Sequence, residues 1–316
     1  MSTSAVVFAY HDVGCRCVSV LLEAGLRVPL VVTHRDSPGE NIWFASVEHL
    51  ARDAGLEVTM PDDPNEPAFV ARLSALAPDF LFSFYYRQML SPAVLATARR
   101  GAFNMHGSLL PKYRGRVPVN WAIIRGERET GATLHEMVEK PDAGRIAGQE
   151  AVPIGDNDTA REVFARVSEA AGSVLARTLP ALIDGTAVLT PQDLGRGSYF
   201  GARRPEDGRI DWTRGAREIH DLIRAVAPPY PGAITSLDAI PVRVLRSWWS
   251  DAPDLPAKGA PGAVAVAGGR TYARCGDGRW LELRSLQFGA QAPLDGEALA
   301  ARFAPGRGGM GQFTLG

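Results

Sequence analysis

The stretch FLFSFYYRQMLSPAVLATARRGAFNMH, residues 80–106, decides the fold because it holds two predicted strands with a predicted helix between them. Phe80–Phe84 and Ala102–His106 are short apolar runs of the kind that form buried strands. Between them, Ser91-Pro92 has the order of cap and proline with which helices begin. A strand, a helix and a second strand in succession indicate a right-handed crossover within a mainly parallel sheet.

The alternation of strands and helices extends toward the N-terminus. Apolar runs predict strands at Ala5–Phe8 and Val28–Thr33, and helical spacing predicts helices at Val18–Ala24, Ser46–Ala54 and Pro67–Leu76. Ligands of such sheets bind beyond the carboxyl ends of the strands. His106 stands at one of these ends, so its position alone makes it a candidate site residue.

The second half of the chain changes character after a loop. Before the loop we expect a short helix at Asn120–Arg125, extended stretches at Ala132–Glu139 and Ile146–Pro153, and a long helix at Thr159–Ile183. The segment Pro191–Arg209 is rich in Gly, Arg, Pro and Asp and lacks periodicity, which is typical of a linker or an ordered loop. After it, a predicted helix at Ala216–Val226 precedes five predicted strands, Ala233–Ser236, Val242–Arg246, Ala263–Ala267, Arg270–Arg274 and Trp280–Ser285.

These patterns predict an α/β protein with two domains. Residues 1–190 are expected to form a Rossmann-like domain with a mainly parallel sheet. Residues 191–209 are expected to form a linker or loop. Residues 210–316 are expected to form a small, mostly-β domain, because five short strands at this spacing suggest a small barrel or sandwich, here taken as an OB-like barrel.

Composition excludes several classes of protein. The 316 residues include 34 basic and 35 acidic side chains, a formal net charge of −1, which argues against a generally basic nucleic-acid binder. Hydrophobic residues make up 46%, too many for a disordered chain. The three cysteines cannot form a disulfide framework, and no apolar run approaches the roughly 18 residues that span a bilayer. We therefore expect a cytoplasmic protein with no membrane partner and no signal peptide.

The most informative motif is Asn104-x-His106 at the end of the predicted strand. Residues i and i+2 share one face of a strand, so the carboxamide and the imidazole should point into the same crevice. Such a pair supplies hydrogen-bond donors but no metal-ligand set. The run Ser108–Gly115 that follows is too long for a tight turn and contains Lys112 and Arg114, which is typical of a binding loop.

Three groups of residues together resemble the folate-dependent formyltransferases. They are Asn104-x-His106, the run Ser108–Pro111 with Arg114-Gly115, and Glu129–Gly131 with Asp142-x-Gly144. Longer strings are similar to one branch of that family, the enzymes that formylate UDP-4-amino-4-deoxy-L-arabinose in lipid A modification. These strings are Phe8–Gly14, Ser83–Arg87, Pro111–Arg116 and Phe200–Asp207. The similarity continues to Cys275–Gly278 and so covers nearly the whole chain.

The resemblance implies a reaction and the residues that perform it. It implies that 10-formyltetrahydrofolate donates a formyl group to the 4-amine of the UDP-linked aminosugar, a lipopolysaccharide modification connected with polymyxin resistance, without a metal. It implies that Asn104, His106 and Asp142 are catalytic. It also implies that the donor site is lined by Gln88, Met89, Leu90, Arg116, Val138, Glu139, Lys140, Pro141 and Asp142.

The chemistry of formyl transfer suits these residue types. The amine attacks the formyl carbon and places negative charge on oxygen, which donors from Asn104 and His106 can stabilise. The leaving nitrogen of the donor needs a proton, which an imidazolium at His106 can supply. We expect the Asp142 carboxylate to favour that charged form and so to raise the pKa of His106.

Acceptors other than this sugar nucleotide remain as alternatives. Arg114 and the pair Arg203-Arg204 are candidates to bind a diphosphate through bidentate contacts. A methionyl-tRNA acceptor would need many cations, yet Gly201–Asp211 balances three arginines against three acids. A different nucleotide-linked aminosugar, such as a dTDP-hexosamine, fits the same residues. A non-catalytic module is disfavoured by the intact Asn104, His106 and Asp142.

Overall fold

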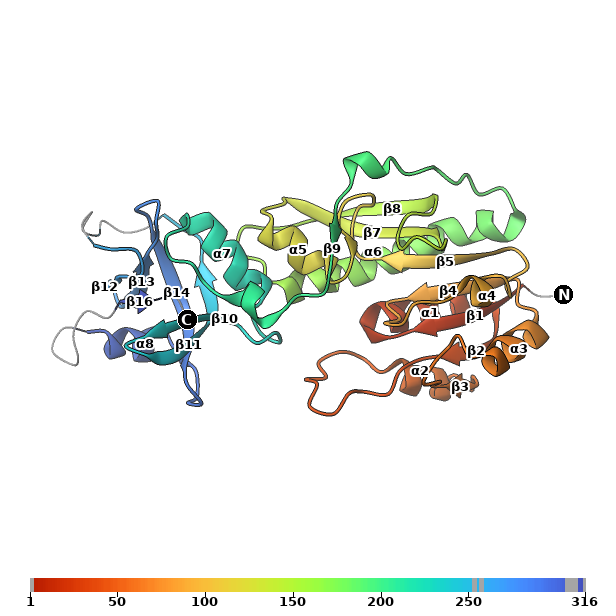
Figure 1. Cartoon of the computed structure of the whole chain (residues 1–316), viewed down its shortest axis with the longest axis horizontal. Coiled ribbons are helices and arrows are strands. Elements are labelled where there is room, and N and C mark those ends of the chain that lie inside the picture. The colour runs from red at the N-terminus through yellow and green to blue at the C-terminus, as the bar shows by residue number, and fades with distance from the viewer. Residues whose placement is uncertain (1–2, 252–254, 256–258, 305–311, 315–316) are drawn as a thin grey trace. The chain divides into compact units, whose positions relative to one another are not determined.

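The structure is a computed structural model, which describes residues 3–251, 255, 259–304 and 312–314 (Figure 1). The chain divides into two compact units. The first contains Met1–Pro118, Glu129–Pro153 and Phe164–Gly201, and the second contains Val119–Arg128, Ile154–Val163 and Ala202–Gly316. Each unit is therefore assembled from more than one segment of the chain.

The first unit is built on a seven-stranded sheet in the order β3-β2-β1-β4-β5-β7-β8. Strands β1 (Ser4–Ala9), β2 (Arg27–Val32), β3 (Val58–Thr59), β4 (Phe80–Phe84) and β5 (Gly101–His106) are parallel, while β7 (Glu129–Glu136) and β8 (Ile146–Pro153) add an antiparallel edge. The expected mainly parallel, Rossmann-like sheet is confirmed. The order places β1 between β2 and β4, so the chain switches from one side of β1 to the other.

Helices connect the parallel strands as the sequence predicts. They are α1 (His11–Glu23), α2 (Val47–Asp53), α3 (Pro67–Leu76) and α4 (Pro92–Leu95), followed by α5 (Pro118–Ile124) and α6 (Ala160–Asp184). Alternate residues of the strands, such as Val6, Phe8 and Leu81, are fully buried against α3 and α4. This packing holds the strand ends at fixed positions, because a buried apolar face specifies the register of each strand.

Several predicted boundaries differ from the structure, among them the start of α1 and the end of β7. Helix α1 begins at His11 rather than Val18, because Asp12, Gly14 and Arg16 interrupt the apolar spacing of its first turns in the sequence. The stretch expected at Ala132–Glu139 is β7, which ends at Glu136, and Met137 instead donates its backbone N–H to Ala102 O. The chain leaves the sheet there and forms the turn that carries Asp142.

The second unit is a small antiparallel sheet with two helices, which confirms the predicted mostly-β domain. Strands β10 (Ala233–Leu237), β11 (Ile240–Trp248), β12 (Val264–Ala267), β13 (Arg270–Arg274), β14 (Trp280–Phe288) and β16 (Phe313–Thr314) follow the order β12-β13-β14-β11-β10-β16, and β15 (Leu294–Asp295) pairs with β14. A bridge between Ala263 and Gln312 joins the two ends of this order, as in a barrel. Helices α7 (Ala216–Ala225) and α8 (Gly296–Arg302) pack on the strands.

Two kinds of feature are absent from the described residues. No helix among them is both long and apolar enough to cross a membrane. No group of three or more His, Cys, Asp or Glu side chains within the same ranges is arranged to hold a metal ion.

Candidate active site

The candidate site lies where β5 ends, and it brings together Asn104, His106 and Asp142 as expected. The His106 ring is buried, with only 6% of the residue exposed. Its Nε2 lies 2.8 Å from the backbone oxygen of Tyr113, and its Nδ1 lies 3.6 Å from Asp142 Oδ1. A carbonyl oxygen only accepts hydrogen bonds, so Nε2 carries a hydrogen and the neutral ring keeps its lone pair at Nδ1, facing the carboxylate.

The turn that carries Asp142 is held from two directions. Asp142 has a left-handed backbone with φ of +52°, and its Oδ2 accepts a 2.8 Å hydrogen bond from the Gly115 N–H. The side-chain amide of Gln192 donates to Asp142 O at 3.0 Å and to Gly144 O at 2.6 Å. A Cβ on Gly144 would lie 2.0 Å from Glu136 O, so only glycine allows the turn to approach β7 this closely.

His135 is a site residue that the sequence analysis missed. It lies on β7 directly opposite Asn104, and its Nε2 is 3.1 Å from Asn104 Nδ2 and 3.5 Å from Asp142 Oδ1. Its Nδ1 lies 2.7 Å from Glu136 O and so carries the hydrogen of the neutral ring. Nε2 therefore accepts from the Asn104 amide, which fixes the direction of the carboxamide. Only the register of an antiparallel pair could have identified this residue.

The charges at the site differ from the expectation. Burial lowers the pKa of His106, and this effect outweighs the Asp142 carboxylate and the Tyr113 carbonyl, which both act to raise it. Asp142 thus acts in the expected direction, but the pKa of His106 is lowered and not raised, because desolvation of the imidazolium dominates.

The carboxyl group of Asp142 stays ionised. Burial acts to raise the pKa of Asp142, but the charge of a protonated His106, the nearby His135 ring and the hydrogen bond from the Gly115 N–H hold it well below its usual value. The Gly115 bond acts whether or not His106 carries a proton. The resting site is thus a carboxylate beside a neutral imidazole.

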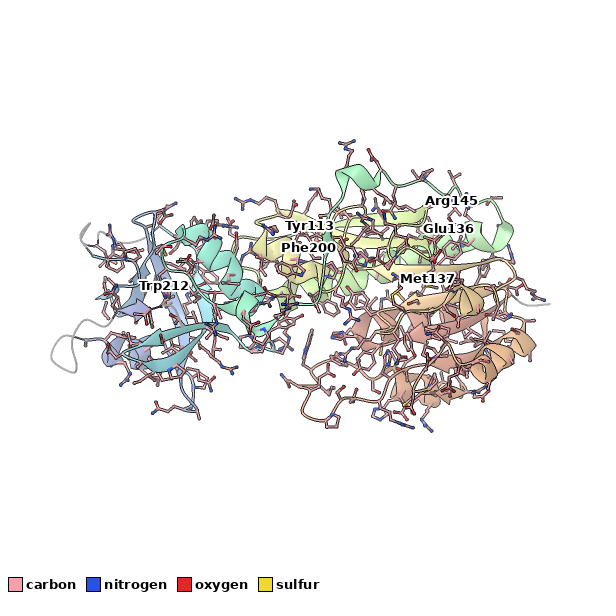
Figure 2. All side chains as sticks on the ribbon, viewed as in Figure 1. Tyr113, Glu136, Met137, Arg145, Phe200 and Trp212 are labelled. Atoms are coloured by element: carbon pink, nitrogen blue, oxygen red, sulfur yellow. The ribbon has the colours of Figure 1, made fainter. Side chains whose placement is uncertain are left out.

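The first part of the predicted loop Pro191–Arg209 packs against the binding loop Ser108–Gly115 and holds it in place. Strand β9 (Tyr199–Phe200) pairs with β6 (Arg114–Gly115), and the Tyr113 N–H donates to Ser198 Oγ at 2.8 Å. The rings of Tyr113 and Phe200 stack with centroids 5.4 Å apart (Figure 2). The backbone oxygen that contacts His106 is therefore fixed by residues almost 90 positions later in the chain.

A cavity of about 640 Å³ adjoins the Asp142 turn. Its lining is mostly apolar side chain and backbone, with Glu136 and Arg145 joined by two hydrogen bonds at the rim (Figure 2). The lining residues are Leu95, Ala96, Gly101, Ala102, Glu136, Met137, Val138, Ala143, Gly144 and Arg145. The volume lies within the range of small-ligand sites.

The residues expected to line the donor site do not all lie at the cavity. Of the residues expected to line the donor site, Val138 lines this cavity, whereas Gln88, Met89 and Leu90 follow β4. Gln88 donates to Asp62 O, Met89 is 59% exposed, and Leu90 packs on the core beneath the sheet. Arg116, Glu139 and Lys140 are exposed, and Pro141 precedes Asp142 in its turn.

The arginines proposed for a diphosphate are divided between the units. Arg114 is buried in the first unit, at 8% exposure, within β6. Arg203 and Arg204 belong to the second unit, where Arg204 precedes the short 3-10 helix Pro205–Gly208. Their binding of substrate stays a prediction.

Comparison with protein families assigns the chain to a class. Residues 24–179 match the family described as formyl transferase, and residues 203–304 match the formyl transferase C-terminal domain. These segments span most of the chain, so the protein belongs to the formyltransferase family and is an enzyme of that class.

Solved structures share the fold. An N-formyltransferase from Helicobacter canadensis, solved with folinic acid and dTDP-3-aminofucose, is 20% identical, with a TM-score of 0.69 over 90% of this chain and 99% of that one. WlaRD, a sugar 3N-formyltransferase solved with dTDP and 5-N-formyl-THF, is 19% identical, with a TM-score of 0.70 over 92% and 99%. HypX from Aquifex aeolicus, solved with tetrahydrofolic acid, is 18% identical, with a TM-score of 0.63 over 96% of this chain and 47% of that one.

Proposed function

We propose that the protein transfers a formyl group from 10-formyltetrahydrofolate to the amine of a nucleotide-linked aminosugar, with the 4-amine of UDP-4-amino-4-deoxy-L-arabinose as its acceptor. The observation that carries the proposal is the position of His106. It lies beside Asn104 at the end of β5, with one acceptor facing each ring nitrogen. The strings shared with the lipid A branch of the family support the choice of sugar.

The cavity beside Asp142 fits one end of the donor. Its apolar walls at Leu95, Met137 and Val138 suit the faces of a flat bicyclic ring, and backbone groups of Ala143 and Gly144 offer hydrogen-bonding atoms at its edge. When bound, the donor supplies an activated formyl carbon and a nitrogen that leaves. The cavity adjoins Asp142 through Ala143 and Gly144, the next two residues of the turn.

The contacts of the two ring nitrogens allow His106 to transfer a proton. In the resting state its Nδ1 is an unprotonated base, and a proton that arrives there meets the Asp142 carboxylate 3.6 Å away. The opposite nitrogen already faces the Tyr113 carbonyl. His106 therefore accepts a proton from the attacking amine and returns one to the leaving nitrogen, while burial keeps water away.

Asn104 donates a hydrogen bond to the oxygen of the formyl group. Its amide nitrogen carries two hydrogens, and the bond to His135 fixes the direction of the second. A donor fixed before the reaction stabilises a developing oxyanion without reorganisation. Asp142 orients His106 and stabilises the protonated ring.

An assay of several acceptors tests the proposal. Purified full-length chain is incubated with 10-formyltetrahydrofolate and, separately, with UDP-4-amino-4-deoxy-L-arabinose, dTDP-3-aminofucose and initiator methionyl-tRNA, and products are analysed by mass spectrometry. We expect formylation of the UDP sugar at the highest kcat/KM. Preferred use of the dTDP sugar, which is the ligand of the similar Helicobacter canadensis structure, would mean that the acceptor is a different nucleotide-linked sugar. Preferred use of the tRNA would overturn the proposal.

A further inference from the structure

An aromatic cluster lies beyond the carboxyl ends of β1, β2 and β4, outside the groups used for formyl transfer. His11 is at its centre, stacked on Phe44 at 3.9 Å between ring centroids and in edge contact with Trp43 at 4.7 Å and Phe164 at 4.6 Å. Tyr85 completes it, 5.5 Å from Phe164. We refer to His11, Trp43, Phe44, Tyr85 and Phe164 as the aromatic cluster.

The cluster occupies the switch point of the parallel sheet. Strand β1 pairs with β2 on one side and β4 on the other, and the connections from these strands diverge at their carboxyl ends. Open α/β sheets bind ligands in the crevice at this point. His11 is the second residue after the end of β1, and Tyr85 directly follows β4.

The cluster is continuous with the candidate active site. A Cβ on Gly107 would lie 1.9 Å from the Tyr85 hydroxyl, so that hydroxyl rests against the peptide that follows His106. The proposed donor cavity lies next to the Asp142 turn, where Ala143 and Gly144 line it. In a direct transfer the donor and the acceptor reach the catalytic group from different directions, which leaves the cluster for the acceptor.

The backbone beneath the cluster is strained, and its loop is fixed. His11 and Tyr85 both have left-handed conformations, with φ of +69° and +59°. Such strain in non-glycine residues concentrates at functional sites. The loop of residues 33–46 is fastened by Arg87, which donates its backbone N–H to His34 Nε2 at 2.9 Å and pairs with Glu40 through two hydrogen bonds.

The rest of the loop is equally constrained. The Tyr10 hydroxyl donates to Asp36 at 2.6 Å, and the Ala45 N–H donates to Asp12 Oδ1 at 2.8 Å. Trp43 is partly exposed at the tip of this loop, and its neighbour Ile42 is 41% exposed. The indole is thus held in place before any ligand arrives.

The chemistry of the cluster selects a flat, neutral ring. Burial lowers the pKa of His11 to about 3, so its imidazole is neutral at physiological pH. The guanidinium of Arg87 is already paired with Glu40, which leaves aromatic faces as the main recognition surface. Aromatic side chains bind nucleobases by stacking, whatever the base.

We infer that the aromatic cluster binds the nucleobase of the acceptor, with Trp43 as the stacking platform and Tyr85 guiding the sugar toward His106. The inference rests on the proposed function for the sugar, but the base site itself requires only a nucleotide. Trp43 is then a determinant of acceptor affinity that has no part in the chemistry of transfer.

Titration with nucleotides alone tests the inference. UMP, UDP and dTDP are added to the full-length chain without folate, and binding is measured by calorimetry. We expect UDP to bind, Trp43→Leu to weaken that binding by about tenfold or more, and Trp43→Phe to lie between the two. Trp248→Leu, which removes a partly exposed indole from the second unit, is the matched control and should bind UDP as the wild type does.

The outcomes separate the inference from the proposed function. Equal affinity of wild type, Trp43→Phe and Trp43→Leu for UDP, at comparable melting temperatures, would overturn the inference even if formyl transfer occurs. Binding that depends on Trp43 without any formyl transfer would sustain the nucleobase site and reject the proposed reaction. In steady-state assays, the KM for the nucleotide sugar should rise in Trp43→Leu while the KM for 10-formyltetrahydrofolate stays unchanged. If Trp43→Leu does not fold, Trp43→Phe decides by the same comparison.

Discussion

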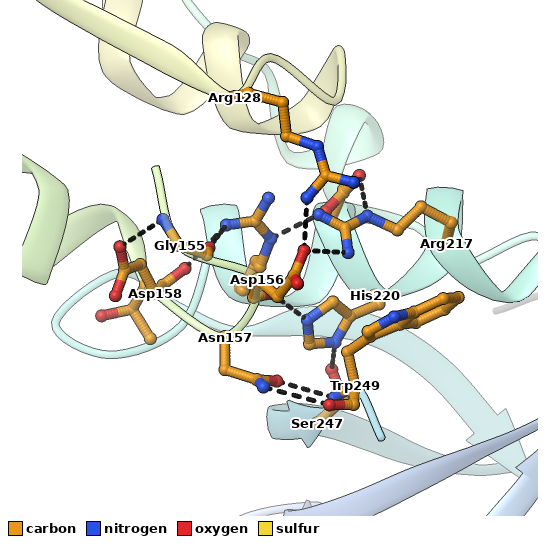
Figure 3. Close-up of polar contacts among 12 residues, drawn as sticks. Arg128, Gly155, Asp156, Asn157, Asp158, Arg217, His220, Ser247 and Trp249 are labelled. Carbon is orange, nitrogen blue, oxygen red and sulfur yellow. Dashed lines mark hydrogen bonds and ion pairs between the residues drawn. The ribbon is translucent and has the colours of Figure 1, made fainter. Parts of the chain in front are cut away.

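His106 in the first unit and His220 in the second are both buried in polar networks, and the two have opposite surroundings. His106 has the Asp142 carboxylate and the Tyr113 carbonyl as neighbours of its two ring nitrogens. His220, which is fully buried in the second unit, has the Ser247 hydroxyl and the Asp156 carbonyl at 2.8 Å each (Figure 3). Both rings are therefore held in a single orientation.

The charges near the two rings explain why only one suits catalysis. Burial, together with the charges of Arg224, Arg217 and Arg246, lowers the pKa of His220 to about 4 despite the bond to the Asp156 carbonyl. A proton on His220 would face guanidinium groups, whereas a proton on His106 would face a carboxylate. Burial and a lowered pKa are thus common to His220 and to His106, the proposed catalytic residue. The sign of the neighbouring charge distinguishes them.

The largest effect after loss of His106 itself should follow from Asp142→Asn. The substitution keeps the shape of the side chain but removes the charge that stabilises a protonated His106, so turnover should fall by about a hundredfold or more. The pKa of His106 should fall further, which moves the acidic limb of the pH–rate profile to lower pH. Steady-state assays from pH 5 to 9 would measure both. An unchanged profile would mean that Asp142 does not act on His106.

A smaller loss of turnover should follow from Gln192→Met. This change removes the two hydrogen bonds that hold the backbone of the Asp142 turn but leaves the catalytic side chains in place. We expect kcat to fall by about tenfold, since small displacements of a catalytic group are costly, with little change in melting temperature. Gln287→Met removes a similar amide-to-carbonyl bond from the second unit and is the control. Equal activities of the two variants would show that Gln192 does not position Asp142.

The substitution His220→Gln should have the smallest effect on turnover and a clear effect on the pH dependence of stability. The pKa of His220 is lower in the folded protein than the usual 6.5, so the unfolded chain binds more protons between about pH 6.5 and 4. The free energy of unfolding should therefore fall as the pH falls through that window, by up to about 3 kcal/mol from this residue. His220→Gln should make the pH dependence shallower by about one proton while kcat stays near wild type. Urea unfolding at a series of pH values measures the slope, and an unchanged slope would contradict the environment described for His220.

The sequence predicted those parts of the site that depend on local pattern. The apolar runs and the Ser91-Pro92 cap predicted the strand that carries Asn104 and His106, and the family resemblance pointed to Asp142. His135 and Gln192 were not found because their roles depend on strand register and on contacts about 50 positions apart. The direction of the His106 pKa was missed for a related reason, since burial is a property of the packed fold.

The sequence likewise predicted those parts of the fold that depend on local pattern. Alternation of strands and helices indicated the parallel sheet, and the short strands after residue 230 indicated the β-rich unit. The antiparallel edge of β7 and β8 was not foreseen, because two extended stretches around a turn carry no signal of which neighbour they will join. The nucleobase site inferred at the aromatic cluster likewise draws on three strand ends that only the sheet order brings together.

The most direct test of the account compares His106→Gln with His220→Gln in one assay of formyl transfer from 10-formyltetrahydrofolate to UDP-4-amino-4-deoxy-L-arabinose. Each substitution replaces a buried histidine by the same amide, so general effects of burial are matched. We predict that His220→Gln keeps turnover within about twofold of wild type, while His106→Gln loses about a hundredfold to ten-thousandfold at an unchanged fold. Similar turnover by both variants would contradict the assignment of His106 as the group that moves the proton.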